Sequence, residues 1–580
     1  MKKNILLLST AFIGFGALPA QEKPATFTTR FETSAGRESA TWHETIDFYK
    51  RLSTRYSTLK LEKAGTADGG YPLHVVYYSA DGDFNIAHWK KEGRITLLIN
   101  NAIHPGEPDG VDACMMLLRD AAQGKIKIPD NVALVVIPMY NIGGALNRNG
   151  YSRANQNGPA AYGFRGNGQN IDLNRDFVKC DAAETRTFEK LFTATDPEIF
   201  IDNHVSDGAD YQHIISLLAT QHDKLGGKTG SFMQEKLNPL LYKDMKKRGY
   251  DLVPYVNNFD NTPANGWTEF YEGPRFSSGY AAQFQTIGYV PETHMLKPFK
   301  QRVEATYALL ECVITEAGKN AAEITAARTA DRQALITQKE FVLEWKADSS
   351  RHDNITFRGY EALYKTSLVS GLPRMYYDHG KPFTKEVPFY NHFVPAKKMS
   401  APAAYIISRA WGAVISRMRR NGVELVPLLH DSTIAVTAYH IDNIETNTRP
   451  YEKHYMHKNI QVSPQTVSIK CRKGDFIIPV NQPAKRYIIE TLEPTAPDAF
   501  LVWNFFDGIL SQKEYFGDYI FEDLAAELLQ NDAGLKMQLE AKRKTDTAFA
   551  KSAEAQLDFV YRHSRYMEPG YMRYPVYRVE

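Results

Sequence analysis

The sequence predicts an α/β fold, with a mixed, mostly parallel sheet flanked by helices, followed by a β-rich C-terminal region with a helical tail. Three apolar runs rich in β-branched residues, at residues 94–100, 131–138 and 198–202, have the composition of short strands. The run at 131–138 is apolar nearly throughout, as in a parallel sheet that is covered on both faces. Between residues 111 and 118 apolar side chains recur at helical spacing, so the first strand leads into a helix.

The length of the chain predicts several domains. At 580 residues the chain is too long for one hydrophobic core. We predict a signal peptide at 1–20, the α/β domain at 21–338, a β-rich domain at 339–515, and a helical tail with an irregular strap at 516–580.

The texture of the sequence changes near residue 340. The α/β domain should end with a helix at 303–313 and a charged helical connector at 321–338. Beyond it, short apolar runs are separated by Pro, Asn, Gly and Asp, which is typical of strands and turns. Strands are expected at 404–408, 432–439, 465–470 and 475–480, a helix at 411–421, helices at 521–562 and a strap at 567–580. The aromatic-rich stretch 490–507 is interpreted as core or interdomain packing.

The first twenty residues have the pattern of a signal peptide. Lys2 and Lys3 precede a short apolar segment at 5–16, and small residues end it at Ala20, before Gln21. The segment is too short for a transmembrane anchor, and no cysteine follows the cleavage site. We therefore expect an exported protein, periplasmic or secreted, that is cleaved near Ala20 and has no transmembrane segment.

Charge and cysteine usage exclude some classes of protein. The formal net charge is +2, and removal of the two leader lysines brings it to zero. A neutral surface argues against nucleic acid as a partner. The four cysteines are scattered without Cys-x-x-Cys spacing and name no disulfide pair. Cys114 and Cys312 lie in apolar helical contexts and are expected in the core.

Two histidines and one glutamate form a candidate metal site. His104 and Glu107 are three residues apart directly after the first predicted strand, and His204 follows the third. Two imidazoles and one carboxylate are a three-ligand set of catalytic zinc, which leaves a fourth position open. Because sites in α/β sheets form at the carboxyl ends of strands, the three side chains should meet there. The sequence therefore predicts one Zn²⁺ per chain.

Four separate motifs, in a fixed order, resemble those of a known family. His-x-x-Glu at 104–107 is followed by Asp-Leu-Asn-Arg at 172–175, then by His204 on its strand, then by Glu292 in Gly-Tyr-Val-Pro-Glu-Thr-His. Together they resemble the zinc carboxypeptidases, the carboxypeptidase A-like metallopeptidases, over residues 40–320. The second half is similar to the long C-terminal region of some exported bacterial members.

The resemblance implies roles for two parts of the chemistry. Glu292 matches the carboxylate that acts as general base on the water that attacks the peptide bond. Asn174 and Arg175 match the pair that binds the terminal carboxylate of a peptide, which a guanidinium meets with two parallel hydrogen bonds.

The same resemblance suggests two supporting groups. Asp172 lies where the family has an acid that orients a zinc histidine. Arg165 resembles the arginine that stabilises the oxyanion, although Arg148 and Arg153 compete for this role in the same loop.

Several neighbouring residues stay unassigned. The family's active-site tyrosine has two candidates, Tyr271 and Tyr280. His213, His222 and His294 are interpreted as hydrogen-bonded or surface residues, because three ligands already complete the zinc set.

These observations predict a zinc-dependent metallocarboxypeptidase whose partner is a peptide with a free C-terminal carboxylate. One alternative is an amidase or deacylase that uses the same zinc set on cell-wall peptides or acyl amino acids. A catalytically silent binding module is the other, and the intact ligand set with Glu292 argues against it. Residue preference, oligomeric state and the role of the C-terminal half stay open.

Overall fold

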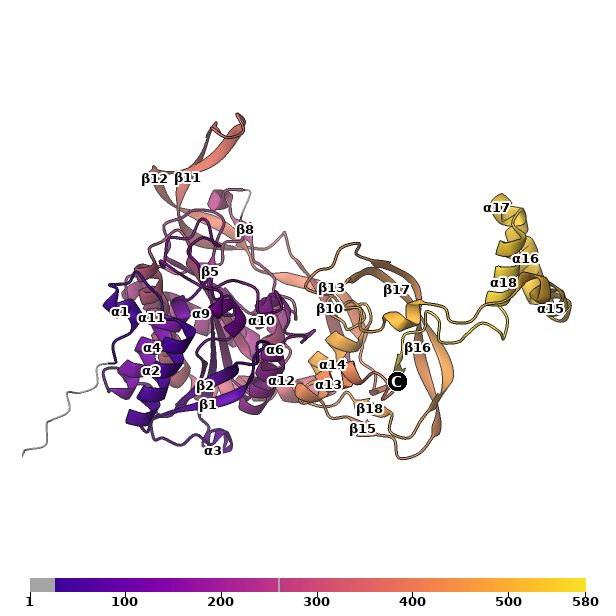
Figure 1. Cartoon of the computed structure of the whole chain (residues 1–580), viewed down its shortest axis with the longest axis horizontal. Helices are drawn as coiled ribbons and strands as arrows, with labels where there is room; N and C mark the ends of the chain where they lie inside the picture. Colours follow the sequence, from indigo (N-terminus) through magenta and orange to yellow (C-terminus); the bar gives the residue numbers. More distant parts are fainter. Residues whose placement is uncertain (1–26, 259–260) are drawn as a thin grey trace, which may run out of the picture.

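The computed structural model describes residues 27–258 and 261–580 (Figure 1). The expected signal peptide and its cleavage site near Ala20 lie outside the described residues. An eight-stranded sheet forms the centre of the first part of the chain, with the strand order β1-β2-β4-β3-β5-β9-β6-β7. Its strands are β1 (Leu59–Thr66), β2 (Pro72–Tyr78), β3 (Ile95–Asn101), β4 (Val132–Ile137), β5 (Ile199–Ser206), β6 (Ile215–Ala219), β7 (Val253–Pro254) and β9 (Ile287–His294).

The sheet is parallel at its centre and mostly antiparallel toward its edges. β3 pairs in parallel with β4 and β5, and β5 pairs in parallel with β9. The pairs β1–β2, β2–β4 and β6–β9 are antiparallel. Every residue of β3, β4 and β5 is buried, which explains why these strands read as continuous apolar runs. The predicted α/β fold with a mixed sheet is confirmed.

One predicted strand is longer than expected. The run at 198–202 was expected to end before His204, but β5 continues to Ser206. The extension is stabilised by β9, whose Glu292 lies opposite His204 in the parallel register. The ligand candidate and the predicted base are therefore on neighbouring strands.

Helices cover both faces of the sheet (Figure 1). Helices α2 (Trp42–Arg55), α4 (Asp109–Ala122) and α11 (Phe299–Lys319) lie on one side, and α6 (Ala183–Thr195) and α10 (Ser277–Ala282) on the other. α4 packs against α2 and α11, and α9 (Asn238–Lys247) also contacts α11. Shorter helices are α1 (Arg30–Thr33), α3 (Ile86–Lys91), α5 (Ile142–Leu146), α7 (His222–Leu225) and α8 (Gly227–Phe232).

After α12 (Ala321–Thr337), strands dominate. The strands are β10 (Glu340–Ala347), β11 (Asp353–Thr366), β12 (Pro373–Tyr390), β13 (Phe393–Ser400), β14 (Ala404–Ile407), β15 (Val426–Pro427), β16 (Ser432–Thr446), β17 (His457–Cys471) and β18 (Phe476–Pro479). Helices α13 (Gly412–Arg420) and α14 (Lys485–Leu492) interrupt them. A six-stranded sheet, which includes β19 (Val576–Val579), has the order β15-β18-β14-β19-β16-β17, so the expected β-rich region is present. The aromatic stretch 490–507 packs in its core, where Phe500, Trp503 and Phe506 are fully buried.

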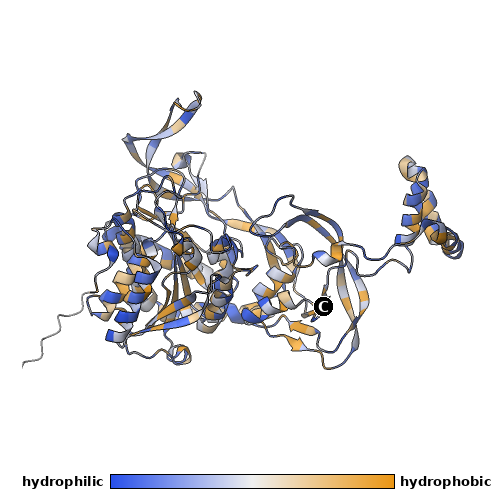
Figure 2. Cartoon of the chain, in the orientation of Figure 1, coloured by the Kyte–Doolittle hydropathy of each residue, from blue (hydrophilic) through white to orange (hydrophobic). Residues whose placement is uncertain are grey.

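A long hairpin, β11–β12, projects from the body of the protein (Figure 1). Hydrophobic and hydrophilic residues are mixed along it (Figure 2). Its base pairs with the short strand β8 (Trp267–Thr268) of the first part of the chain. Two segments that are far apart in the sequence are joined at this place.

The end of the chain corrects one expectation. The predicted helical tail consists of α15 (Asp518–Asn531), α16 (Ala533–Thr545), α17 (Thr547–Ala550) and α18 (Ala553–Arg562). The last residues are not an irregular strap throughout, because β19 (Val576–Val579) pairs with β14 and β16 in the six-stranded sheet. Val576 and Arg578 are buried there, so an extended segment completes the sheet. The boundaries at 338 and 515 stay predictions.

Two further findings concern the described residues. No helix among them is long and apolar enough to span a bilayer. The four cysteines are all buried and unpaired within the same residues. Cys114 and Cys312 belong to the core of the first part, as expected.

Candidate metal centre and active site

The three predicted metal ligands meet at the carboxyl ends of two neighbouring parallel strands. His104 and Glu107 lie in the turn between β3 and α4, where the Glu107 N–H donates a hydrogen bond to the His104 carbonyl at 2.9 Å. His204 lies near the end of β5, which pairs with β3. Gly110 lets the first turn of α4 pack closely on the end of β3, because a Cβ there would lie 2.4 Å from Asn101 Oδ1.

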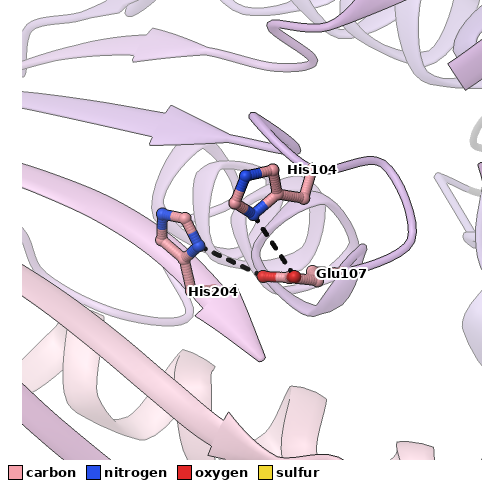
Figure 3. Close-up of side chains that lie close together, drawn as sticks. All are labelled: His104, Glu107 and His204. Carbon is pink, nitrogen blue, oxygen red and sulfur yellow. Dashed lines mark hydrogen bonds and ion pairs between the residues drawn. The ribbon is translucent and has the colours of Figure 1, made fainter. Parts of the chain in front are cut away.

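The carboxylate of Glu107 lies beside the two imidazoles and directs one oxygen toward each of them (Figure 3). His104 Nδ1 is 3.3 Å from Glu107 Oε1, and His204 Nδ1 is 3.1 Å from Glu107 Oε2. The two rings meet edge to face with their centroids 4.9 Å apart. All three side chains are at least 96% buried. One ligand atom of each residue lies within 4.8 Å of the others, which is a spacing that one metal ion can bridge.

The outer nitrogens of both histidines are fixed by carboxylates. His104 Nε2 is 2.9 Å from Asp172 Oδ1, and His204 Nε2 is 3.0 Å from Asp202 Oδ2. Such pairs set the tautomer, so each Nδ1 presents a lone pair to the centre. His104 Nδ1 is buried and forms no hydrogen bond within the described residues. The donor set therefore fits Zn²⁺, which takes imidazole nitrogen and carboxylate oxygen.

The electrostatics of the three residues favour a cation at their centre. Burial alone would raise the pKa of Glu107, but the charges of Arg153 and His104 hold it well below its usual range. Burial opposes protonation of His204, yet the Asp202 carboxylate raises the pKa of His204 well above its usual range. An ionised carboxylate faces an imidazole whose surroundings attract positive charge, which is the condition a metal ion satisfies.

A cavity of about 370 Å³ opens beside this centre. All seven residues predicted for the site line it, and they are His104, Glu107, Arg165, Asn174, Arg175, His204 and Glu292. The structure brings together motifs from four places in the chain. Their individual roles stay predictions.

Glu292 projects from β9 next to His204. Its Oε2 is buried and without a hydrogen-bond partner among the described residues. Burial raises the pKa of the Glu292 carboxyl to about 8, and the charges of Glu107 and Glu272 add to this rise, although His204 opposes it. A cation bound at the ligand set would favour its ionised form again.

The three arginines of the loop separate in the structure. Arg165 lines the cavity and its Nε donates to Asp172 Oδ2 at 2.9 Å, with Nη1 3.6 Å from Glu107. Arg153 also lines the cavity, but its Nη1 lies 2.6 Å from Glu107 Oε1. Arg148 is directed away and donates to the Ser39 and Ala161 carbonyls. The structure therefore leaves Arg165 and Arg153 as candidates for the oxyanion.

Asn174 and Arg175, which we call the carboxylate clamp, are positioned by contacts with neighbouring residues. The Asn174 side-chain oxygen accepts from the Ser277 N–H at 3.2 Å, which leaves its Nδ2 for a ligand. The Arg175 guanidinium lies 4.4 Å above the Phe276 ring. Its Nη1 donates to the Asn174 carbonyl at 2.8 Å, and its Nη2 has no hydrogen bond within the described residues. Each member of the pair keeps one donor for an anionic group.

Neither tyrosine that the sequence suggested lines the cavity. Tyr280 is fully buried and donates to Asn421 Oδ1 at 2.5 Å, and Tyr271 stacks on Phe393 in another part of the fold. Tyr255, which sequence reasoning missed, lines the cavity instead. Burial raises the pKa of its hydroxyl, with Glu292 as the next cause. No sequence signal marked Tyr255, because it follows a two-residue strand and lies outside the spacing of the resemblance.

Sequence reasoning also missed a contribution from the second half of the chain. The turn at 451–454, between β16 and β17, reaches the clamp. The Tyr451 hydroxyl accepts from Arg175 Nε at 3.1 Å, and the Glu452 carboxylate accepts from the Asp172 N–H at 2.8 Å. Glu452 and Lys453 have φ angles of 47° and 77°, a conformation that side chains rarely adopt. The C-terminal half thus supports the site directly.

Comparisons with known proteins give the following likenesses. No family model matches the chain. "Carboxypeptidase 2" of Trichophyton rubrum is 21% identical over 502 residues, which cover 83% of this chain and 87% of the relative. "Probable carboxypeptidase 2" of Arthroderma benhamiae is 22% identical over 500 residues, covering 83% and 88%. The alignments therefore extend into the second half of both chains.

Two solved structures show a weaker likeness. A metallo-carboxypeptidase from Burkholderia cenocepacia has a TM-score of 0.37 and 14% identity, over 48% of this chain and 70% of its own. The carboxypeptidase A from Helicoverpa armigera has a TM-score of 0.36 and 13% identity, over 50% and 74%.

Proposed function

We propose that this chain, which belongs to the carboxypeptidase A-like family of metallo-carboxypeptidases, removes residues singly from the C-terminus of peptides with a zinc ion bound by His104, Glu107 and His204. As a metallopeptidase of this family it is a hydrolase. What supports this proposal is that three groups of residues line one cavity: the ligand set, the Glu292 carboxyl, whose Oε2 has no hydrogen-bond partner among the described residues, and the pair Asn174 and Arg175.

Zinc, when bound, would lower the pKa of a water molecule and polarise the peptide carbonyl. His104 and His204 would bind it through Nδ1, because their Nε2 atoms are engaged with Asp172 and Asp202. Glu107 would supply the carboxylate oxygen. The carboxylates of Asp172 and Asp202 keep the two imidazoles in place and raise their basicity as ligands.

Glu292 is suited to accept and return the proton. It is the one predicted catalytic carboxyl, and its Oε2 is uncommitted within the described residues. A general base must lie within hydrogen-bond reach of the proton that it takes. Glu292 on β9 lies directly opposite the proposed ligand His204 on the neighbouring strand β5. The same carboxyl would then protonate the leaving amine.

Arg165 is suited to stabilise the oxyanion. It faces the cavity from the side of Glu107, and the Asp172 carboxylate fixes its Nε. A preorganised donor near developing negative charge lowers the barrier without reorganising during the reaction. Arg153 would mainly orient Glu107, to which it is already paired.

The clamp predicts the mode of cleavage. Asn174 and Arg175 would bind a free terminal carboxylate, so an amidated peptide should be a poor substrate. Arg175→Ala should lose about 1.5–3 kcal/mol of binding, the value of a hydrogen bond to a charged group, or roughly 10- to 10²-fold in kcat/KM toward free-acid peptides. Arg175→Lys keeps the charge without the planar guanidinium, so its kcat/KM should lie between those of the wild type and of Arg175→Ala. Steady-state kinetics on matched free-acid and amidated peptides measure this.

Equal cleavage of both peptides by the wild type, with internal products, would contradict exopeptidase action. It would favour the alternative, an amidase or deacylase with the same metal site. Purified peptidoglycan fragments and acyl amino acids, assayed beside the peptide pair, separate these substrates.

Tyr255 is proposed to take the place of the active-site tyrosine that Tyr271 and Tyr280 do not occupy. Tyr255 lines the cavity, and the charge of Glu292 contributes to the raised pKa of its hydroxyl. Tyr255→Phe should lower kcat/KM by about 10-fold, the equivalent of one hydrogen bond of about 1–1.5 kcal/mol, and leave metal content unchanged. Tyr280→Phe is the matched control and should affect stability rather than kcat/KM. A Tyr255→Phe enzyme with wild-type kinetics would remove this tyrosine from the site.

We also propose export as part of the function, with cleavage near Ala20, on the leader pattern of the sequence. N-terminal sequencing of the protein recovered from the host's extracytoplasmic fraction tests the cleavage. A start at Met1 would contradict it.

A further inference from the structure

A second cluster of metal-binding side chains lies outside the cavity of the candidate active site. It consists of His222 and Asp223 at α7 and His392 between β12 and β13, with Asp353, at the start of β11, next to His392. Ligand atoms of His222, Asp223 and His392 all lie within 4.8 Å of one another. The two imidazole rings meet edge to face with centroids 5.5 Å apart. We call these four residues the 222/392 cluster.

The carboxylates of the 222/392 cluster are already oriented by neighbouring amides. Asp223 Oδ2 accepts from the Phe393 N–H at 2.7 Å and lies 3.5 Å from His222 Nε2. Asp353 Oδ2 accepts from Asn391 Nδ2 at 2.7 Å, while its Oδ1 faces His392 Nε2 at 3.7 Å. Hydrogen bonds of this kind hold metal ligands in place from the outside, because a carboxylate keeps further lone pairs for the ion.

Uncompensated oxygen atoms beside the cluster indicate a missing positive charge. Glu269 Oε2 and Asn391 Oδ1 are buried, and neither has a hydrogen-bond partner among the described residues. Buried polar oxygens are nearly always satisfied in folded proteins. A bound cation would offset the charge of the three carboxyl groups of Asp223, Asp353 and Glu269 and accept lone pairs from the two imidazoles.

We propose that the 222/392 cluster binds a second zinc ion, with His222, Asp223 and His392 as ligands and Asp353 as the fourth. Two imidazoles with carboxylate oxygens suit Zn²⁺ better than Ca²⁺ or Mg²⁺, which take oxygen ligands alone. Four protein ligands make a closed site, and closed zinc sites are structural. The expected content of the chain rises from one zinc ion to two.

The position of the cluster gives this ion a structural task. His222 and Asp223 belong to the α/β part, whereas Asp353 and His392 come from the strands that follow residue 340. β12, which pairs with β11, also pairs with β8, and the Glu269 N–H donates to the Tyr390 carbonyl at 3.0 Å. Phe270 and Glu272, directly after this junction, line the cavity of the candidate active site. The ion would tie the wall of the cavity to the β-rich region and close a long loop.

Metal analysis of the full-length chain tests the proposal. After dialysis with Zn²⁺ and then against zinc-free buffer, the wild type should contain two zinc ions per chain. His392→Ala should contain one and should keep its hydrolytic turnover, while His204→Ala should also contain one but lose turnover. His352→Ala is the matched control, because this neighbouring histidine packs against the Tyr390 ring outside the cluster, and the variant should keep two ions.

Asp223→Asn and Ca²⁺ serve as a second variant and a second metal in the test of the 222/392 cluster. If His392→Ala does not fold, Asp223→Asn retains an acceptor for the Phe393 N–H and should still reduce the content to one ion. The thermal midpoint of His204→Ala should rise with added Zn²⁺, and that of the double variant His204→Ala/Asp223→Asn should not. A wild type that retains one zinc ion, an ion count that ignores these substitutions, or uptake of Ca²⁺ in place of Zn²⁺ would each overturn the second site. A wild type whose single ion follows His204 would overturn it while leaving the proposed function intact.

Discussion

Glu292→Gln should retain its metal and bind substrate but lose at least ~10²-fold in kcat, within the 10²–10⁴-fold range of general acid–base groups. The exchange is nearly isosteric, and Oε2 of Glu292 makes no hydrogen bond within the described residues, so little packing should change. What is lost is the group that we propose as acceptor of the proton of the attacking water. Steady-state kinetics on a free-acid peptide, together with zinc content, measure the two effects separately.

Glu316→Gln is the control for this substitution. Glu316 is a buried glutamate on α11 outside the cavity, paired with Lys319, and its exchange should leave kcat unchanged. A Glu292→Gln enzyme with near wild-type turnover would show that another group activates the water. Loss of zinc in the same variant would instead make Glu292 part of the metal site.

The central sheet and the ligand set were accessible from the sequence for one physical reason. Strands buried on both faces must be apolar throughout, so β3, β4 and β5 were visible as continuous runs. Parallel strands end at the same edge, and residues directly after them meet there. His104, Glu107 and His204 could therefore be placed together without a structure.

Features that depend on distant pairing could not be predicted in this way. The extension of β5 to Ser206 follows from its register with β9, which the local sequence does not encode. The end of the chain had no strand pattern of its own, yet β19 completes a sheet whose neighbours lie more than a hundred residues earlier. Both cases reflect packing partners that are remote in sequence.

The same limit applies to the wall of the site. Tyr255 is brought into the cavity by the pairing of two-residue β7 with β6, a signal too short to read in a sequence. Tyr451 and Glu452 reach the clamp from a turn nearly three hundred residues away from Asp172. Motifs located the proposed reacting groups, but only the fold shows which residues contact them.

His204→Ala should lose one zinc ion per chain and with it hydrolysis. The substitution removes one of the three proposed ligands. A catalytic zinc ion lowers the barrier by several kcal/mol, so kcat/KM should fall by at least ~10³-fold. The fold should remain, because β5 is held by its neighbours β3 and β9. Asp202 is then left fully buried with one donor, Asn100 Nδ2 at 3.0 Å, which should cost about 1–3 kcal/mol of stability.

Two variants make this result specific to the ligand. His213→Ala removes a buried imidazole whose hydrogen bonds, within the described residues, are only those with the Asp251 carbonyl and the Arg358 N–H, so the variant should keep its zinc and its activity. Asp202→Asn leaves the ligand but weakens its orientation, and metal affinity should fall by about 10- to 100-fold. Metal affinity should therefore fall moderately in Asp202→Asn and strongly in His204→Ala, with unchanged circular dichroism. Both substitutions affect metal binding by His204 Nδ1. Full zinc occupancy in His204→Ala, measured beside wild-type protein in the same buffer, would mean that His204 is a buried structural histidine and that the ion, if present, is bound elsewhere.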